Sequence, residues 1–449
     1  MGAMTAPQAP ASTPPDSLRL DYPVFERVLD NGLRVIASPD HAGGSVAVNL
    51  WYDVGSRHEE PGRTGFAHLF EHLMFQGSAN VASAEHFGLL QPAGASVNAT
   101  TWFDRTNYFE ALPAGGLDLA LWLEADRMGT LLSALTQENF ENQREVVKEE
   151  KRQRYDNVPY GDVIELIIGL VFGEGHPYSH TVIGSMDDLN AAEVEDARNF
   201  FRRFYMPNNA VLSIVGDVDA ETAFAKADKY FSPVPAGTRP EKLITDPLPP
   251  LTAAAPSSAE SSGLPRREKT ADVPADAVYL TWRLPADRAP GYDALDLAFG
   301  VLGQGQSSRL IKNLVRGREI AESAFASSMG LIGGNSLGMV GSRARSGVSP
   351  EQLEEALVGE VERLSTEPPT EAELERAKAQ FERHWMHELA RVDSRADQLS
   401  GFATLHGDPG LINTRFAEIE AVDAEEVSAA IADWFTAEQR ATLIYRQEA

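Results

Sequence analysis

Cysteine is absent from this chain of 449 residues. Disulfide bonds are therefore excluded, and so are zinc sites with thiolate ligands. A zinc site in this protein must be built from histidine and carboxylate side chains.

Long apolar runs are also absent. No stretch approaches the roughly 20 apolar residues that a membrane-spanning helix requires, so we expect no membrane partner. Residues 1–20 are rich in Pro, Ala and Ser and lack the basic and apolar regions of a signal peptide. We expect this tail to be disordered, with the residues before Met4 left over from cloning, and we expect a cytoplasmic protein.

Positive charge is scarce, because 39 Lys and Arg face 66 Asp and Glu, which gives a formal net charge of −27. Nucleic acids and anionic membrane surfaces repel such a chain, so we expect neither as a partner. The same charge suits binding of basic peptides, although acidity most often serves solubility alone.

One short segment carries the strongest chemical signal, HLFEHLMFQGS. On a helix, His68 and His72 project from one face and can bind a single tetrahedral zinc ion. Glu71 lies beside them and can act as general base, as in H-x-x-E-H inverzincins. The alternative is an ordinary polar stripe, since five-residue motifs recur by chance. A catalytic zinc also needs a third protein ligand.

A second predicted helix, QENFENQREVVKEEKRQRYDN, offers that ligand after a capping Thr136. At about 100° per residue, Glu150 projects between Val146 and Val147, whereas Glu149 is turned roughly 110° away. A carboxylate among valines is costly to bury without a cation, so Glu150 is the candidate ligand. Glu149 fits a solvated surface charge.

Six segments together resemble the pitrilysin-type metallopeptidases, in the branch of short bacterial proteases related to the mitochondrial processing peptidase. They are FERVLDNGLRVIASPD, GFAHLFEHLMFQGS, VNATTWFDRTNYFEAL, VVKEEKRQRYDNVPYG, GHPYSHTVIGSMDDL and NNAVLSIVGDVD. The resemblance covers nearly everything from about Tyr22 onward. It implies zinc as the cofactor, His68, His72 and Glu150 as its ligands, and Glu71 as the general base. Because the family spacing varies by about one residue, Glu149 stays a weaker candidate.

The resemblance also implies how substrate binds. In the family an edge strand beside the active site pairs with the main chain of a peptide, and Asn98 and Ala99 match the positions that contact it. Such pairing gives affinity with broad sequence tolerance. Peptides or unfolded protein segments are therefore the expected substrates.

Arg309, in GVLGQGQSSRLIKNLV, matches an arginine that helps to hold the substrate carbonyl or tetrahedral intermediate in many relatives. Those relatives pair it with a tyrosine, where this chain has Glu322. An ionised glutamate cannot donate to an oxyanion, so this assistance is either reduced or supplied by a partner subunit. An ordinary structural arginine is the alternative for Arg309.

The second half of the chain repeats the first in degraded form. LDLALWLEADRM followed by TQENFENQREVVKEEKRQR returns as LEEALVGEVERL followed by TEAELERAKAQFERHWMHE. Aligning GFAHLFEHL with GYDALDLAF places Ala294, Leu297 and Ala298 where the first half has its histidines and glutamate. The second half has therefore lost the metal ligands.

These observations predict an α+β fold with a catalytic half over residues 21–235, a Pro/Ala/Ser-rich linker over 236–272 and a metal-free half over 273–449. The resemblance implies that the halves form a clam-shell chamber. The predicted function is a zinc-dependent endopeptidase that works as a homodimer or as a heterodimer with a related metal-free subunit. The alternatives are a non-catalytic peptide-binding or scaffold subunit, and a catalytic subunit active only with such a paralogue.

Overall fold

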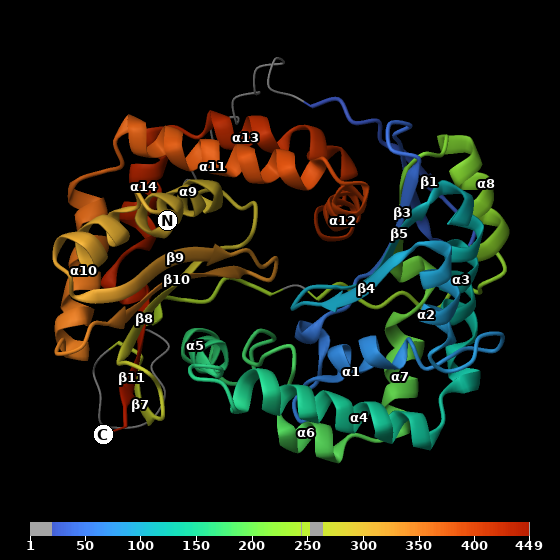
Figure 1. The fold of residues 1–449 in the computed structure, drawn as a ribbon, viewed down its shortest axis with the longest axis horizontal. Helices are drawn as coiled ribbons and strands as arrows, with labels where there is room; N and C mark the ends of the chain where they lie inside the picture. The colour runs from blue at the N-terminus through green and yellow to red at the C-terminus, as the bar shows by residue number, and fades with distance from the viewer. Residues whose placement is uncertain (1–19, 244, 252–263, 449) are drawn as a thin grey trace, which may run out of the picture.

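Two α+β halves face each other in the computed structural model, each built around one sheet (Figure 1). The structure describes residues 20–243, 245–251 and 264–448. The expected tail up to residue 19 and the middle of the expected linker lie outside these ranges. The predicted fold class is confirmed.

The first sheet has six strands in the order β1-β2-β6-β3-β5-β4. They are β1 (Phe25–Val28), β2 (Arg34–Pro39), β3 (Ser45–Tyr52), β4 (Ser96–Thr101), β5 (Thr106–Pro113) and β6 (Ala210–Gly216). The helices of this half are α1 (Phe66–Leu73), α2 (Glu85–Leu90), α3 (Leu117–Ala134), α4 (Gln137–Lys151), α5 (Val163–Phe172), α6 (Met186–Ala191), α7 (Val194–Phe204) and α8 (Ala220–Phe231). Among the residues that the structure describes, β4 is an edge strand that pairs with β5 alone.

The second sheet has five strands in the order β7-β11-β8-β10-β9. They are β7 (Arg266–Ala271), β8 (Ala277–Pro285), β9 (Ala321–Met329), β10 (Asn335–Ala344) and β11 (Arg440–Gln447). The helices are α9 (Tyr292–Gly303), α10 (Pro350–Thr366), α11 (Glu371–Leu389), α12 (Val392–Gly401), α13 (Arg415–Ala421) and α14 (Ala424–Trp434).

The strand order confirms the internal repeat. Without β1, the first order reads β2-β6-β3-β5-β4 and matches the second strand for strand. The parallel pair of the first sheet, β2 with β6, corresponds to the parallel pair β7 with β11, while the other pairs are antiparallel. The aligned segments also fold alike, because α1, α3 and α4 occupy the places of α9, α10 and α11.

One helix of each half packs against the sheet of the other half (Figure 1). The first sheet packs against α3 and α8 of its own half on one face and against α12 of the second half on the other. The second sheet packs against α9, α10 and α14 on one face and against α5 of the first half on the other. Both sheets are therefore covered on two faces, which accounts for the nearly continuous burial of β3, β6 and β8.

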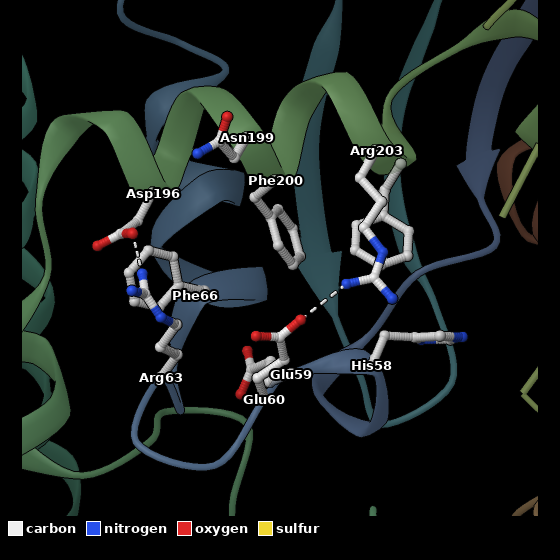
Figure 2. A pocket seen from close by; sticks show the side chains of 10 residues that line it. His58, Glu59, Glu60, Arg63, Phe66, Asp196, Asn199, Phe200 and Arg203 are labelled. Carbon is white, nitrogen blue, oxygen red and sulfur yellow. Dashed lines mark hydrogen bonds and ion pairs between the residues drawn. The ribbon is translucent and has the colours of Figure 1, made fainter. Parts of the chain in front are cut away.

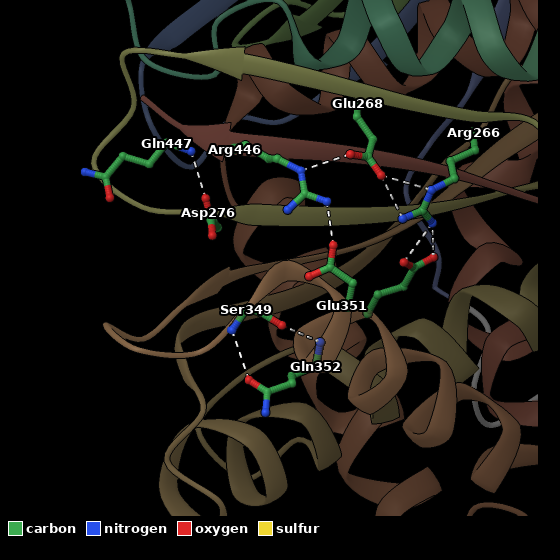
Figure 3. A network of polar contacts seen from close by, with 9 residues as sticks. Arg266, Glu268, Asp276, Ser349, Glu351, Gln352, Arg446 and Gln447 are labelled. Carbon is green, nitrogen blue, oxygen red and sulfur yellow. Dashed lines mark hydrogen bonds and ion pairs between the residues drawn. The ribbon is translucent and has the colours of Figure 1, made fainter. Parts of the chain in front are cut away.

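The predicted end of the linker at residue 272 is too late, because β7 already belongs to the second sheet. Its sequence RREKTA lacks an apolar alternation, since β7 is an edge strand with mostly exposed side chains. These side chains form ion pairs at the sheet edge (Figure 3). Arg266 pairs with Glu354 at 2.6 Å, and Arg446 pairs with Glu268 at 2.9 Å. Charge at this edge disfavours pairing with another strand.

Across the described ranges, no helix combines the length and the apolar character needed to cross a bilayer.

Candidate active site

The HLFEH segment forms α1, a short helix of eight residues that packs against α4 and β4. It begins after Gly65, whose φ of 89° lies in the left-handed region. A Cβ at this position would also lie 2.6 Å from the carbonyl oxygen of Ile183, so glycine is required by both conformation and space. The apolar residues of α1 face the core, and His68 and His72 are left on the face toward α4.

The third candidate ligand comes from α4. Thr136 caps this helix by accepting a hydrogen bond from the Asn139 backbone N–H, and Oδ1 of Asn139 in turn accepts the backbone N–H of Thr136. Val147 is buried while Val146 is 42% exposed, so the apolar face is narrower than the sequence suggested. Glu150 nevertheless turns toward α1.

The three side chains converge at one point. Nε2 of His68 lies 3.8 Å and Nε2 of His72 lies 3.4 Å from Oε2 of Glu150. One ligand atom from each residue lies within 4.8 Å of the other two. Zinc bonded at about 2.0–2.2 Å to nitrogen and oxygen sets tetrahedral edges of roughly 3.3–3.6 Å. The donor set and its spacing therefore fit a zinc ion with a fourth, open position.

The protonation states of the ligands also suit a metal. Burial foremost, and then the neighbouring His72, lower the pKa of His68 to about 4, so His68 is neutral near pH 7. The hydrogen bond with His72 lowers the pKa of Glu150, which keeps its carboxylate ionised. Neutral imidazole and ionised carboxylate are the forms that bind metals.

Glu71 lies beside the ligands and is held from β4. The Oγ1 hydroxyl of Thr101 donates a hydrogen bond of 2.5 Å to Oε2 of Glu71. Burial raises the pKa of Glu71, and the Thr101 hydrogen bond opposes that rise. A carboxylate with a raised pKa is a stronger base than an exposed one, which suits proton transfer near neutral pH.

Glu149 is turned away from this site. Its carboxylate contacts Arg152 at 3.1 Å and Gln153 at 2.9 Å on the exposed side of the helix. The second oxygen of Glu150 instead contacts Arg154 at 2.7 Å, in the π-helical segment Arg152–Asp156 that continues α4. The geometry thus favours Glu150 over Glu149 as the metal ligand.

Asn98 and Ala99 lie in the middle of β4, on the edge strand. The Asn98 side chain is exposed, and its Oδ1 accepts the backbone N–H of Ala99 at 2.9 Å. The Ala99 side chain is buried beneath the strand. An open strand edge next to Glu71 is the arrangement that main-chain pairing with a peptide requires.

Arg309 is engaged elsewhere in this conformation. Its Nε and Nη2 donate to the two carboxylate oxygens of Glu373 at 3.0 and 2.8 Å, and Nη1 donates to the carbonyl of Glu367 at 2.8 Å. These contacts tie the start of α11 to the loop before it. Glu322 is exposed on β9. The structure does not bring Arg309 into contact with the residues around His68.

Sequence reasoning missed two residues that contact the site, Thr101 and Arg154. The signals were present, because Thr101 is two residues after Ala99 and so shares its face of the strand. Arg154 follows Glu150 by four residues, which is the spacing of neighbours on one helical face.

A second group with metal-compatible spacing occurs in the described ranges, and it differs in kind. His86, Glu110 and Glu124 are buried in the core, with His86 Nε2 at 3.7 Å from Glu110. Arg127 already supplies a cation there, with Nε at 3.0 Å from Glu124. A positive charge in the cluster opposes binding of a metal ion.

Comparison with known proteins identifies the family of this chain. The model of the insulinase family, peptidase family M16, matches residues 34–167, and the model of the peptidase M16 inactive domain matches residues 191–381. The zinc protease PqqE of Helicobacter pylori is 32% identical over 381 residues, which cover 84% of this chain and 81% of that protein. The uncharacterized zinc protease YmxG of Bacillus subtilis is 23% identical, over 92% of this chain and 96% of that protein.

Solved structures give the same result. The crystal structure of a protease from Helicobacter pylori superposes with a TM-score of 0.84 and 28% identity, covering 95% of this chain and 100% of that one. A structure described as a peptidase M16 inactive domain from Pseudomonas fluorescens has a TM-score of 0.82 over 95% of this chain and 98% of that one. Its 16% identity shows a shared fold alone. The predicted resemblance is confirmed, and the chain belongs to peptidase family M16.

Proposed function

We propose that this protein is a zinc-dependent endopeptidase that hydrolyses peptides or unfolded protein segments. The observation that carries the proposal is the convergence of His68, His72 and Glu150 beside a half-buried Glu71. The names of the relatives, which are zinc proteases, support the class of reaction.

In this proposal His68, His72 and Glu150 hold the zinc ion. When bound, zinc polarises the scissile carbonyl and lowers the pKa of a water molecule to around 7. Glu71 takes a proton from the attacking water and passes it to the leaving amine. Thr101 keeps the accepting oxygen of Glu71 in place through its short hydrogen bond.

The free edge of β4 binds the substrate. Its main chain offers pairing positions next to Glu71, with Asn98 and Ala99 at the centre of the strand. An extended peptide adds to such an edge through backbone hydrogen bonds. In a folded domain most backbone N–H and C=O groups are already paired, so they cannot form these bonds. Peptides and unfolded segments are therefore the proposed substrates.

Arg309 is proposed to assist the developing oxyanion only after it releases Glu373, because its donors are engaged in the present conformation. This requirement, together with Glu322, favours a second possibility. The chain would then be a catalytic subunit that becomes fully active in a homodimer or with a related metal-free subunit. The partner would supply the missing donor.

The first experiment compares the wild type with Glu71→Gln. Zinc is measured by elemental analysis, and cleavage is measured on a mixture of unstructured basic peptides with and without a chelator. Stoichiometric zinc in both proteins, with chelator-sensitive cleavage in the wild type and a loss of at least about 100-fold in the variant, supports the proposal. Zinc without cleavage in the wild type favours a missing partner, and absence of zinc from both favours a scaffold subunit.

A further inference from the structure

A buried carboxylate contacts the start of the helix that carries the HLFEH segment. The side chain of Glu59, in the loop before α1, has no exposed surface. Its Oε2 accepts the backbone N–H of Gly65 at 2.8 Å, and its Oε1 accepts that of Ala67 at 2.7 Å. Glu59 thus uses both carboxylate oxygens on the backbone of one helix end.

These two bonds matter because α1 is so short. The first N–H groups of a helix have no partner within it, and here two of them are satisfied by Glu59 alone. Ala67 immediately precedes His68 in the chain. A negative side chain at this end also interacts favourably with the helix dipole. Burial raises the pKa of Glu59, and the hydrogen bonds from Ala67 and Gly65 oppose this rise.

A second carboxylate fixes the adjacent residue. Oδ2 of Asp188, on α6, accepts both the backbone N–H of Thr64 at 2.9 Å and its hydroxyl at 2.6 Å. The Thr64 hydroxyl in turn accepts the backbone N–H of Ser185 at 2.9 Å. Glu59 holds the first turn itself, whereas Asp188 holds the residue before it.

The neighbour of Glu59 is oriented differently. Glu60 is 66% exposed and pairs with Arg203 at 3.0 Å on the surface of α7. Both glutamates line a pocket of about 270 Å³ between this loop and α7, which also includes Phe66 and Phe200 (Figure 2). None of the residues that line this pocket is a candidate ligand or the candidate base. Besides its two bonds to the backbone of α1, Glu59 contacts Nδ1 of His180 at 3.5 Å, and the contacts with α1 are the ones that link it to His68 and His72.

We propose that Glu59 is a positioning residue for the zinc site, because it sets the place of α1 against α4. The inference rests on the proposed function. His68 and His72 belong to α1 while Glu150 belongs to α4, so a small displacement of α1 changes all distances to Glu150. Groups that orient metal ligands without touching the metal typically contribute 10- to 100-fold to metal affinity.

The test is Glu59→Gln with Glu60→Gln as its matched control. Glutamine keeps the shape of glutamate but replaces one acceptor oxygen by an NH₂ group, which then faces a backbone N–H. Zinc affinity is measured by competition with a chelator, and the fold of the zinc-free proteins is checked by circular dichroism and thermal melting. Glu59→Gln is expected to bind zinc about 10- to 100-fold more weakly, while Glu60→Gln binds like the wild type. Cleavage by Glu59→Gln is expected to recover at high zinc concentration.

Glu59→Asp serves as a second variant in case Glu59→Gln does not fold. It keeps the charge but is one methylene shorter, so zinc binding should also be weakened. Wild-type zinc affinity in a folded Glu59→Gln or Glu59→Asp protein would overturn the inference. An equal loss in Glu60→Gln would overturn it as well. Absence of zinc binding by the wild type is a different result, because it contradicts the proposed function itself.

Discussion

Two equivalent helices show how one fold serves two purposes. In the first half, α1 leaves His68 and His72 with side-chain exposures of 12% and 23%. In the second half, α9 packs against α11 and α14, and the matching Ala294 and Ala298 are 5% and 0% exposed. These small apolar side chains are part of the packed core around α9. The repeat therefore lacks the metal ligands, and Ala294 and Ala298, which take their places, are buried.

The largest effect is expected for the candidate ligand Glu150, in the first half. Glu150→Gln removes an ionised ligand and is expected to weaken zinc binding by more than about 100-fold, with a parallel loss of cleavage. Glu149→Gln makes the same chemical change one residue earlier and should bind zinc normally, since Glu149 contacts only Arg152 and Gln153. Chelator competition measures both. Equal losses in the two variants would contradict the assignment of Glu150.

The second prediction exchanges residues between the halves. Ala298→His places an imidazole in a fully buried position and should lower the free energy of unfolding by about 3 kcal/mol. The reciprocal His72→Ala, made in zinc-free protein, should change it by less than about 1 kcal/mol. Chemical denaturation of both variants checks this asymmetry. Similar costs at the two positions would show that the second site is not more tightly packed than the first.

The third prediction separates a structural role of Arg309 from a catalytic one. Hydrogen bonding by Arg309 lowers the pKa of Glu373 from 4.5 to about 2. Because the folded-state pKa is the lower one, this pair stabilises the protein above pH 4.5, and the stabilisation is lost as the pH falls toward 2. Arg309→Met should therefore cost about 2 kcal/mol near neutral pH.

Denaturation of the wild type and of Arg309→Met across this pH range is the measurement. The difference between them should shrink as the pH falls, whereas a constant difference would argue against the Glu373 interaction. Arg345→Met is a suitable control, since Arg345 forms an exposed pair with Glu319. Cleavage by folded Arg309→Met protein then tests its proposed catalytic role directly.

The fourth prediction concerns a hydrogen bond between the halves. The Tyr178 hydroxyl donates to Asp104 at 2.5 Å and accepts the backbone N–H of Gly333, in the second half, at 2.9 Å. Tyr178→Phe should cost about 1–2 kcal/mol and speed hydrogen exchange at Gly333. Tyr230→Phe removes a hydroxyl whose bond to Asp118 lies within the first half. It should leave exchange at Gly333 unchanged, and a similar change in both variants would contradict a specific link.

Local patterns predicted much of the candidate site. His68 and His72 follow from helical spacing. The direction of Glu150 agrees with the burial of Val147 but not with Val146, which is exposed. Thr101 could be placed on the face of Ala99, but its partner could not, because the contact with Glu71 joins residues 30 positions apart. Glu59 gave no periodic signal, since it lies in a loop and acts on the backbone.

The internal repeat made the division into two similar halves predictable from the sequence. The matching segments identified two halves, and they folded into equivalent helices and strands. The start of the second half was misplaced, because the charged β7 resembles a linker in composition. The sequence also did not predict that α5 and α12 each cover the sheet of the opposite half. An apolar helix such as VIELIIGLVF indicates burial but does not say which sheet it covers.

The exchange of α5 and α12 has a consequence for the second half of the protein. Each half supplies only part of the hydrophobic core around its sheet, and a helix of the other half supplies the rest. A fragment that ended after α8 would leave Ile36, Ala47 and Val215 without the cover of α12. Removing the second half would therefore expose apolar residues of the first sheet, although the candidate metal ligands all lie in the first half.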